Sequence, residues 1–432
     1  MTPRQFLRKY RYDRRLVTGQ YYASDPLKVE RGEQVGVVLL NLGGPTKAED
    51  VAPFLYNLFM DPVIIDMPVS RTLRDWISRF VAKTRSRKVV RDYEVIGGGS
   101  PINRLTREQA QTLERHLNAR YGTPAGVAFR TYIAMRYWHP TSEEAADRMK
   151  ADGIDKVVLL PLYPHYSKTT TGSSQVYWWM LEQEKEIPAW PTTHVYEFAA
   201  NPKYVQAISE RIDEAIQRFP KEVRDDVHIL FSAHGTPLRE MKERRDPYCC
   251  LIHGTVDRVM AYRENDRPFS VSFQSKVGPA EWLTPSTIDK VQELAEQGVK
   301  ALLVVPVAFV TDHIETAYEL DVLVRQEADD AGLRHFEVTS GLNCHPLFIE
   351  ALAEATVSQL ELPVDVNVLR GGGNGDGSAS DYPLRPLDQL PRFRSAERTV
   401  RCHQCEQITE ARCWVQPRSL PEPVRSGQKL EK

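Results

Sequence analysis

The sequence predicts an α/β fold of two Rossmann-like lobes around a cleft. Short continuous runs rich in Val, Ile and Leu, typical of parallel strands buried on both faces, alternate with amphipathic helical stretches. This alternation favours a doubly wound arrangement, and it falls into two similar halves. Titratable side chains follow several of the apolar runs, at the carboxyl ends of strands, where open α/β sheets bind ligands.

The predicted elements follow one another in a regular order. We expect strands at 35–40, 127–134, 156–162, 228–232, 269–273 and 301–307, because these runs are short and apolar. We expect helices at 107–120, 142–152, 204–218, 288–296 and 347–361, where apolar side chains recur with a helical period. The first lobe then covers 35–200 and the second covers 201–362.

Three segments fall outside the predicted lobes. Residues 1–34 form a basic N-terminal extension, whose first 15 positions hold six Lys and Arg against one Asp. It lacks the apolar core of a secretory signal, and we expect a solvated extension in preference to a transit peptide. Residues 363–399 contain the glycine-rich run 371–377 and indicate a flexible linker. Residues 400–432 form a tail that carries cysteines.

The composition limits the classes of function. The chain has 432 residues, is 41% hydrophobic and 26% charged, and has a net charge of −2, as is usual for a soluble globular protein. A nucleic-acid-binding protein would carry a basic excess. No run approaches the roughly 20 apolar residues of a membrane span. Six cysteines in a chain of this length indicate a reducing compartment, and no glycine-rich run has the spacing of a nucleotide loop.

Two strand ends carry titratable groups that suit proton transfer. His234 ends one apolar run, and Asp312, His313 and Glu315 follow another, with Glu319 further along. In a helix, Asp312, Glu315 and Glu319 would lie on one face, where buried carboxylates raise one another's pKa. A histidine with carboxylates at two strand ends suits removal of a proton from a ligand, or transient metal binding. The alternative is a solvated acidic helix N-terminus.

Other strand ends offer groups for a flat, apolar, acidic ligand. Arg136 and Tyr137 end one apolar run with a cation and an aromatic ring. The turns 41–45 and 96–101 contain adjacent glycines, which permit close approach of the backbone to a ligand or simply form tight turns. Between these turns, the apolar segment 54–80 has basic flanks. It suits an element on a membrane surface or the wall of an apolar pocket, or else a core helix with a solvated basic face.

The tail has the spacing of a metal site. Cys402 and Cys405 are separated by two residues, and Cys413 follows nearby. Thiolates select zinc or an iron–sulfur cluster, and three thiolates need a fourth ligand. Cys344 is the best thiol candidate for that fourth ligand, and His403 would serve for zinc. The adjacent pair at 249–250 is a poor geometry for one small site and is interpreted as structural.

Taken in order, these motifs resemble the ferrochelatase family over about 37–360. The resemblance is carried by 40–45, 96–101, 136–137, 163–166, 171–174, 231–234, 274–279, 282–283 and 312–316. It implies two lobes with parallel four-stranded sheets around a porphyrin cleft. It also implies a lyase that inserts Fe²⁺ into protoporphyrin IX to form protohaem, the last step of haem biosynthesis, with no nucleotide.

The resemblance assigns roles to individual residues. His234 becomes the active-site histidine and Glu315 its acidic partner, and both are also expected to hold the substrate Fe²⁺. Glu319 and Asp312 extend an acidic path away from them, and His313 orients it. Substrate contacts are expected from Asn41, Leu42, Arg136, Tyr137, Tyr163, Ser275 and Trp282.

The resemblance also implies a setting and a cofactor. The segment 54–80 matches a hydrophobic lip that faces the membrane, so we expect a homodimer held peripherally on the cytoplasmic side of the inner membrane. The tail resembles family members with a [2Fe–2S] cluster. Its last spacing is longer, and Lys168 stands where the animal enzymes have a distant fourth cysteine. We therefore expect Cys344, Cys402, Cys405 and Cys413 as ligands.

Three alternatives stay open at this point. The porphyrin could be coproporphyrin, or the chain could be a cobalt chelatase acting on a corrin precursor. From a different class, a two-lobed protein of this kind could carry haem or a metal without turnover.

Overall fold

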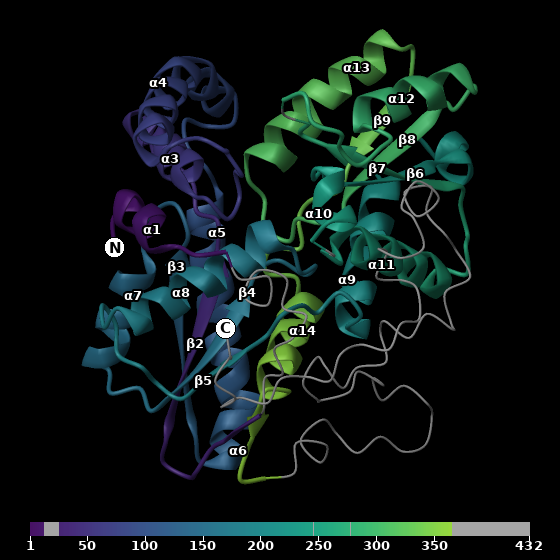
Figure 1. The fold of residues 1–432 in the computed structure, drawn as a ribbon. Coiled ribbons are helices and arrows are strands. Elements are labelled where there is room, and N and C mark those ends of the chain that lie inside the picture. The colour runs from purple at the N-terminus through teal and green to yellow at the C-terminus, as the bar shows by residue number, and fades with distance from the viewer. Residues whose placement is uncertain (13–25, 245, 277, 365–432) are drawn as a thin grey trace. The chain divides into compact units, whose positions relative to one another are not determined.

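The computed structural model describes residues 1–12, 26–244, 246–276 and 278–364 (Figure 1). The chain forms two compact units. Unit 1 contains Met1–Phe198 together with the described residues from Ile349 onward, and unit 2 contains Ala199–Phe348. Each unit is an α/β body built on a parallel sheet, which confirms the predicted fold class.

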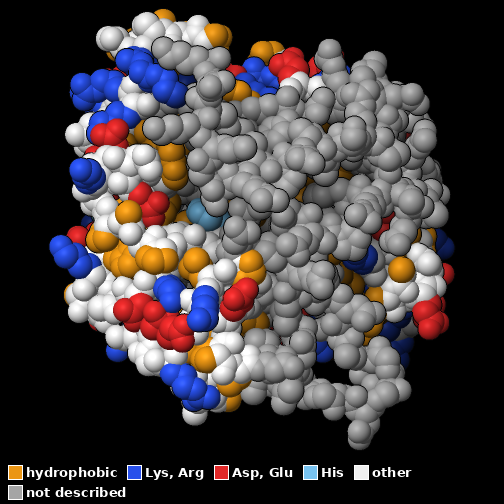
Figure 2. All heavy atoms as spheres, turned by 60° about the horizontal axis from the view of Figure 1, so that its bottom comes forward, with side chains coloured by type: hydrophobic (Ala, Val, Ile, Leu, Met, Phe, Trp, Pro, Cys, Tyr) orange, Lys and Arg blue, Asp and Glu red, His pale blue; other side chains and the backbone are white. Residues whose placement is uncertain are grey.

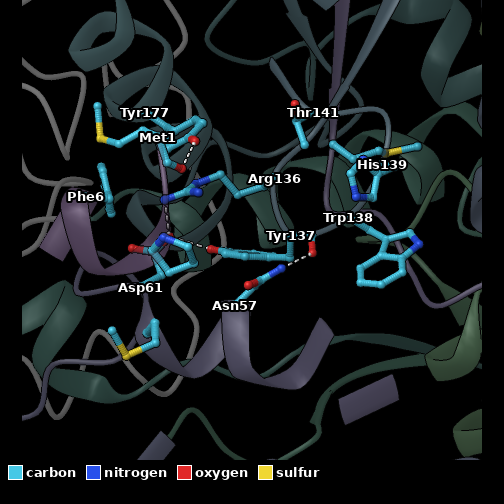
Figure 3. Close-up of a pocket in the computed structure, with 13 residues that line it drawn as sticks. Met1, Phe6, Asn57, Asp61, Arg136, Tyr137, Trp138, His139, Thr141 and Tyr177 are labelled. Atoms are coloured by element: carbon cyan, nitrogen blue, oxygen red, sulfur yellow. Dashed lines mark hydrogen bonds and ion pairs between the residues drawn. The ribbon is translucent and has the colours of Figure 1, made fainter. Parts of the chain in front are cut away.

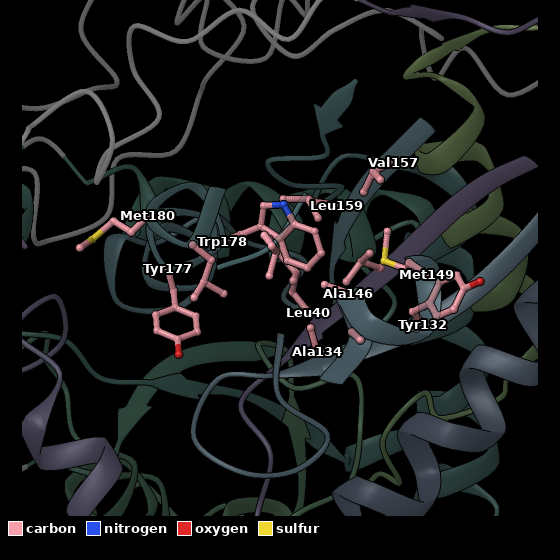
Figure 4. Close-up of a cluster of buried hydrophobic side chains, with 14 of the residues drawn as sticks. Leu40, Tyr132, Ala134, Ala146, Met149, Val157, Leu159, Tyr177, Trp178 and Met180 are labelled. Atoms are coloured by element: carbon pink, nitrogen blue, oxygen red, sulfur yellow. The ribbon is translucent and has the colours of Figure 1, made fainter. Parts of the chain in front are cut away.

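The sheet of unit 1 has four parallel strands in the order β3-β2-β4-β5. They are β2 (Gln34–Asn41), β3 (Ala128–Met135), β4 (Lys156–Pro161) and β5 (Thr192–His194). The interior strand β2 is buried along almost its whole length, which explains its unbroken apolar run. One face of the sheet packs through Leu40 and Leu159 against Met149 and Trp178 (Figure 4).

Helices of unit 1 cover and extend this sheet. Those that pack through the cluster of Figure 4 are α7 (Ser142–Ala151), α8 (Ser173–Gln183) and α1 (Pro3–Lys9). Helices α3 (Val51–Met60) and α4 (Arg71–Val95) lie side by side (Figure 1). The remaining elements are η1 (Ala48–Asp50), α5 (Ile102–Leu117), η2 (Asn118–Gly122), α6 (Thr123–Ala125) and η3 (Lys168–Gly172).

Unit 2 repeats the plan with strands in the order β7-β6-β8-β9. These are β6 (His228–His234), β7 (Phe269–Gln274), β8 (Ala301–Pro306) and β9 (His335–Val338). Its other elements are α9 (Pro202–Ile216), η4 (Lys221–Asp226), α10 (Leu238–Lys242), α11 (Tyr248–Tyr262), α12 (Thr287–Glu296), η5 (Glu315–Val324) and α13 (Arg325–Asp330). All six predicted strands are present, whereas β5 and β9 were missed because they are short and partly polar.

Within the predicted N-terminal extension, residues 1–12 contain a docked helix instead of a solvated segment, and residues 13–25 lie outside the described part of the chain. Thr2 caps α1 with a capping box, and Phe6 is buried against Tyr177, with the two ring centroids 5.3 Å apart. Arg4 of α1 donates to Asp75 of α4 from Nε at 2.9 Å and from Nη2 at 2.6 Å. The aromatic ring therefore docks the segment, while its basic side chains lie outward or pair with acidic partners.

The end of the described chain returns to unit 1. Residues of α14 (Pro346–Val357) from Ile349 onward belong to this unit, whereas the sequence placed 349–362 in the second lobe. Strand β10 (Leu360–Glu361) pairs in parallel with β1 (Leu27–Lys28). His116 Nε2 lies 2.7 Å from Glu350 Oε2, and Thr193 donates to Gln359. These long-range partners, which no local pattern reveals, draw the segment to unit 1.

The surface of the described residues carries both signs of charge. On the face shown in Figure 2, basic and acidic side chains lie interspersed over the coloured part, in keeping with the net charge of −2. Among the described helices, none has the length and apolar character needed to cross a membrane. The predicted linker from 365 onward and the predicted cysteine tail lie outside the described residues.

Candidate active site

In unit 2, the carboxyl end of β6 presents His234. The strand is buried as far as Ala233, and the His234 side chain is 38% exposed. The chain then turns at Gly235, whose N–H donates to the Gln274 carbonyl at 2.8 Å. A Cβ at Gly235 would lie 2.9 Å from that same oxygen and 3.2 Å from the Trp282 ring. The glycine therefore lets the chain turn closely behind the histidine.

Two carboxylates from η5 face this histidine. Glu315 opens the π-helix, and its Oε2 lies 2.9 Å from His234 Nδ1. Glu319 lies four residues on, and Ser275 donates to its Oε2 at 2.7 Å. The structure thus brings together four of the residues that the sequence predicted: His234 at the end of β6, Ser275 just after β7, and Glu315 and Glu319 in η5.

The three titratable groups divide into distinct roles. Burial opposes the charge on His234, but Glu315 and Glu319 outweigh it, so the pKa of His234 is raised above its ordinary value. Burial would raise the pKa of Glu315, but the His234 charge and hydrogen bond lower it on balance. Burial, followed by the Glu315 charge, raises the pKa of Glu319. The pair can therefore hold a charge near neutral pH, and Glu319 is the carboxylate more disposed to take a proton.

The sequence predicted that Asp312 shares a helical face with these two carboxylates. It does not, because the helix begins at Glu315. Its Oδ1 accepts from Thr316 Oγ1 at 2.9 Å and from Gly341 N at 3.0 Å, and its Oδ2 accepts from Asn343 at 2.7 Å. Asp312 therefore fixes the start of η5 to the 341–343 loop.

His313 is buried and supports the site from behind. Its Nδ1 lies 3.0 Å from the Thr311 carbonyl, and its ring centroid lies 4.6 Å from that of Phe309. The Phe309 ring in turn meets the His234 ring edge-on at 6.3 Å. Burial lowers the pKa of His313, so it is a neutral packing partner and not a second charge.

Two neighbours of His234 complete its surroundings. Tyr248, which sequence reasoning missed, is buried, and burial followed by the Glu315 charge raises its pKa. The only signal for it was its place shortly after the His234 turn. Trp282 pairs with Pro237 in an antiparallel bridge and lies against Gly235. This contact places Trp282 behind the turn.

In unit 1, Arg136 and Tyr137 at the end of β3 meet Asp61 (Figure 3). Arg136 Nη2 lies 2.7 Å from Asp61 Oδ2, and the Tyr137 hydroxyl donates to the same oxygen at 2.7 Å. Sequence reasoning missed Asp61, which lies inside the apolar segment 54–80. These residues line a pocket of about 170 Å³, below the ~300–1,000 Å³ usual for ligand pockets.

The other predicted contacts of unit 1 have local partners. Asn41 donates to Thr106 at 3.0 Å and accepts from Leu42 N at 2.8 Å, which holds the turn after β2. The two glycine-rich turns pack against each other, because a Cβ at Gly44 would lie 2.5 Å from Ser100 Cβ. Tyr163 is half-buried, and burial raises its pKa.

Of the four cysteines predicted as cluster ligands, one lies within the described residues. Cys344 is half-buried in the turn before α14, and Lys168 is buried at the start of η3. Cys402, Cys405 and Cys413 lie outside the described residues. Over the described ranges, no group of three or more His, Cys, Asp or Glu side chains is arranged to hold a metal ion.

Comparison with known proteins identifies the family. The ferrochelatase family model matches residues 34–360. The ferrochelatase of Trichodesmium erythraeum is 43% identical over 331 residues, covering 76% of this chain and 84% of the relative. That of Gloeobacter violaceus is also 43% identical and is covered to 98% of its length. A solved structure of SirB from Bacillus subtilis with Fe³⁺ aligns with a TM-score of 0.44 at 9% identity, over 76% of this chain and 95% of SirB. The chain belongs to the ferrochelatase family.

Proposed function

We propose that the chain inserts Fe²⁺ into protoporphyrin IX to form protohaem, with His234 and Glu315 assisting the removal of the pyrrole protons and the insertion of the metal. Membership of the ferrochelatase family supports metal insertion into a porphyrin as a step of haem biosynthesis. The observation that carries the residue assignment is the 2.9 Å contact between His234 Nδ1 and Glu315 Oε2 at the carboxyl end of β6.

The chemistry requires a base. A free-base porphyrin loses two pyrrole protons when Fe²⁺ enters, and pyrrole N–H groups are weak acids. Because Nδ1 of His234 is engaged by Glu315, its Nε2 is the nitrogen available to accept a proton. Glu315 then stabilises the imidazolium, and Glu319, with its raised pKa, is placed to receive the proton next. Once the first proton has passed to Glu319, His234 is neutral again and can accept the second. While it is unprotonated, its imidazole and the Glu315 carboxylate can also hold the incoming Fe²⁺ substrate.

Multiple-turnover metalation tests this proposal. Anaerobic protein with Fe²⁺ and protoporphyrin should quench porphyrin fluorescence over many equivalents. His234→Ala should lose at least about 100-fold in rate, the usual scale for a general base, while still binding porphyrin. His228→Ala, at the opposite end of the same strand, is the matched control and should turn over normally.

Each contrary result has a definite meaning. Turnover by His234→Ala at the wild-type rate would remove the histidine from the chemistry. Quenching that stops at one equivalent would identify a carrier of haem or metal. Faster turnover with coproporphyrin than with protoporphyrin would change the substrate, and turnover restricted to Co²⁺ with a corrin precursor would change the reaction.

We also propose a [2Fe–2S] cluster held by Cys344, Cys402, Cys405 and Cys413. Four thiolates are the ligand set of such a cluster, and Cys344 is a half-buried residue that forms no disulfide. Cys344→Ser should remove the visible absorption of anaerobically purified protein and its acid-labile sulfide. Cys250→Ser should change neither. Full absorption in the Cys344 variant would take this residue off the ligand list.

The setting we propose is a homodimer held peripherally on the cytoplasmic face of the inner membrane by the lip, residues 54–80. Leu73, Trp76 and Phe80 are 46%, 62% and 56% exposed, and the two aromatic rings stack at 5.6 Å. Exposed cations such as Lys83 follow on α4. A Trp76→Glu, Phe80→Glu variant should lose flotation with vesicles containing phosphatidylglycerol, unlike Ile288→Glu in unit 2. Light scattering should give the mass of two chains.

A further inference from the structure

We propose that Asp61 is a positioning residue for porphyrin insertion, which fixes Arg136 and Tyr137 at the end of β3 in the arrangement that the substrate meets. This inference rests on the proposed function, because it gives Arg136 and Tyr137 a role toward porphyrin. Asp61 itself is not assigned any contact with substrate.

The first argument is the concentration of donors on one buried oxygen. Asp61 is 2% exposed and follows the last residue of α3. Its Oδ2 accepts from Tyr137 and from Ser173, both at 2.7 Å, and lies 2.7 Å from Arg136 Nη2. Its Oδ1 accepts from Val63 N at 2.7 Å. A carboxylate with this many short contacts has one orientation, and it transmits that orientation to its partners.

The second argument is that the turn carrying Asp61 is itself held rigidly. Arg74 of α4 is buried, and its Nη2 lies 3.2 Å from the Phe59 carbonyl, 2.8 Å from that of Asp61 and 2.6 Å from that of Ile65. One guanidinium therefore closes the whole turn between α3 and α4. Asp61 is fixed by its backbone as well as by its side chain.

The third argument is that Arg136 has no other carboxylate at ion-pair distance among the described residues. Its side chain is 8% exposed, and its guanidinium lies 4.2 Å from the Tyr177 ring centroid and 4.7 Å from that of Phe6. Its Nε donates to Ser173 at 3.0 Å. A buried cation among rings needs a compensating charge to stay in place, and Asp61 supplies it.

The cluster also connects the predicted substrate contacts of unit 1. The backbone N–H of Arg136 donates to the Asn41 carbonyl at 2.8 Å, and that of Tyr137 donates to the Leu42 carbonyl at 3.1 Å. Ser173 lies at the start of α8, beyond the end of β4. Asp61 thus joins the segments that follow β3 and β4, and the backbone bonds of Arg136 and Tyr137 connect them to the segment that follows β2. Misplacement of such groups by about 1 Å can cost about 100-fold in rate.

The experiment compares porphyrin kinetics with stability. Asp61→Asn should raise the KM for protoporphyrin by about tenfold or more, with a smaller change in kcat, because the buried cation loses its partner. Asp152→Asn is the matched control: its Oδ2 also meets a tyrosine and an arginine in the same unit, accepting from the Tyr132 hydroxyl at 2.6 Å and lying 3.8 Å from Arg130 Nη1. It should leave KM unchanged. Leu113→Ala opens a cavity at a buried position of α5. It controls for the effect of a lowered Tm and should also leave KM unchanged.

A double variant tests the route through Arg136. If Asp61 acts by placing Arg136, the KM of Asp61→Asn, Arg136→Gln should equal that of Arg136→Gln alone. Independent, multiplying effects would overturn that route, and so would a normal KM in Asp61→Asn. Should Asp61→Asn fail to fold, the double variant, which lacks both charges, still gives this comparison with Arg136→Gln. A wild-type chain that does not turn over porphyrin would instead reject the proposed function.

Discussion

At the scale of single residues, His234 and Arg136 show that pairing with a carboxylate can have two different roles. Each stands at the carboxyl end of a parallel strand, and each lies within 3 Å of a carboxylate oxygen. His234 is partly exposed, and its partner Glu315 keeps it able to change protonation near neutral pH. Arg136 is buried, and Asp61 fixes it as a permanent charge. The first pairing suits proton transfer, and the second suits holding a side chain in a fixed position.

The pH dependence of turnover follows from the first pairing. Glu315 raises the pKa of His234 against the effect of burial, so Glu315→Gln should move the acidic limb of kcat/KM to lower pH. Glu319 still faces the ring, and His313 and Tyr248 add no negative charge near neutrality. Histidine NMR titration of metal-free protein checks the shift directly. An acidic limb at the same pH in both proteins would show that another group controls it.

The same shift fixes the sign of its contribution to stability. Because the folded pKa of His234 is raised above the unfolded value of about 6.5, its stabilisation is complete below that pH. It is lost as the pH rises through the folded pKa. The stability difference between wild type and Glu315→Gln should therefore shrink as the pH is raised above neutrality, as measured by urea unfolding.

Sequence reasoning found residues that follow strands and missed Asp61, which follows a helix. His234 and Glu315 could be predicted because the ends of buried parallel strands are recognisable and converge. Asp61 could not, because its three side-chain partners lie 75 to 112 positions away along the chain. In the sequence it is one carboxylate in an apolar segment. Only the fold, which brings the residue after α3 to Tyr137 and Ser173, shows its role.

At the scale of elements, the π-helix η5 decides which carboxylates face His234. The sequence predicted an α-helical face from Asp312, but a π-helix has a wider turn and starts at Glu315. Asp312 is left outside to anchor the loop. Apolar periodicity cannot distinguish an α-helix from a π-helix over ten residues. The sequence therefore predicted the three carboxylates, but it did not predict that Asp312 would have a different role from Glu315 and Glu319.

The docked helix α1 gives an element-scale prediction. Phe6 is buried against Tyr177 and under the Arg136 guanidinium, so Phe6→Ala should lower the free energy of unfolding by about 3 kcal/mol. Arg8, exposed on the same helix, is the control, and Arg8→Ala should change it by less than about 0.5 kcal/mol. Urea unfolding with unchanged slope measures both. Equal midpoints for the two variants would mean that α1 does not contribute to the fold.

At the scale of the whole molecule, the alternation of strands and helices was enough to predict two α/β units, each built on a parallel sheet. It was not enough to assign every segment to its body. The periodicity of α14 predicts that the helix has an apolar face, but it does not indicate which of the two units covers that face. Its assignment to unit 1 depends on Glu350 meeting His116 and on β10 meeting β1, contacts that span more than 200 positions.

Hydrogen exchange can test that assignment with two crossed variants. Glu350→Ala removes the 2.7 Å contact with His116, and Glu337→Ala removes the 2.8 Å contact with Arg218 within unit 2. An ion pair between partly exposed side chains contributes at most about 1 kcal/mol, which is enough to change local opening. Glu350→Ala should therefore speed exchange in α5 and in the β1–β10 pair and leave β8 and β9 protected, whereas Glu337→Ala should do the reverse. Faster exchange of β8 and β9 in the Glu350 variant would instead tie α14 to the stability of unit 2.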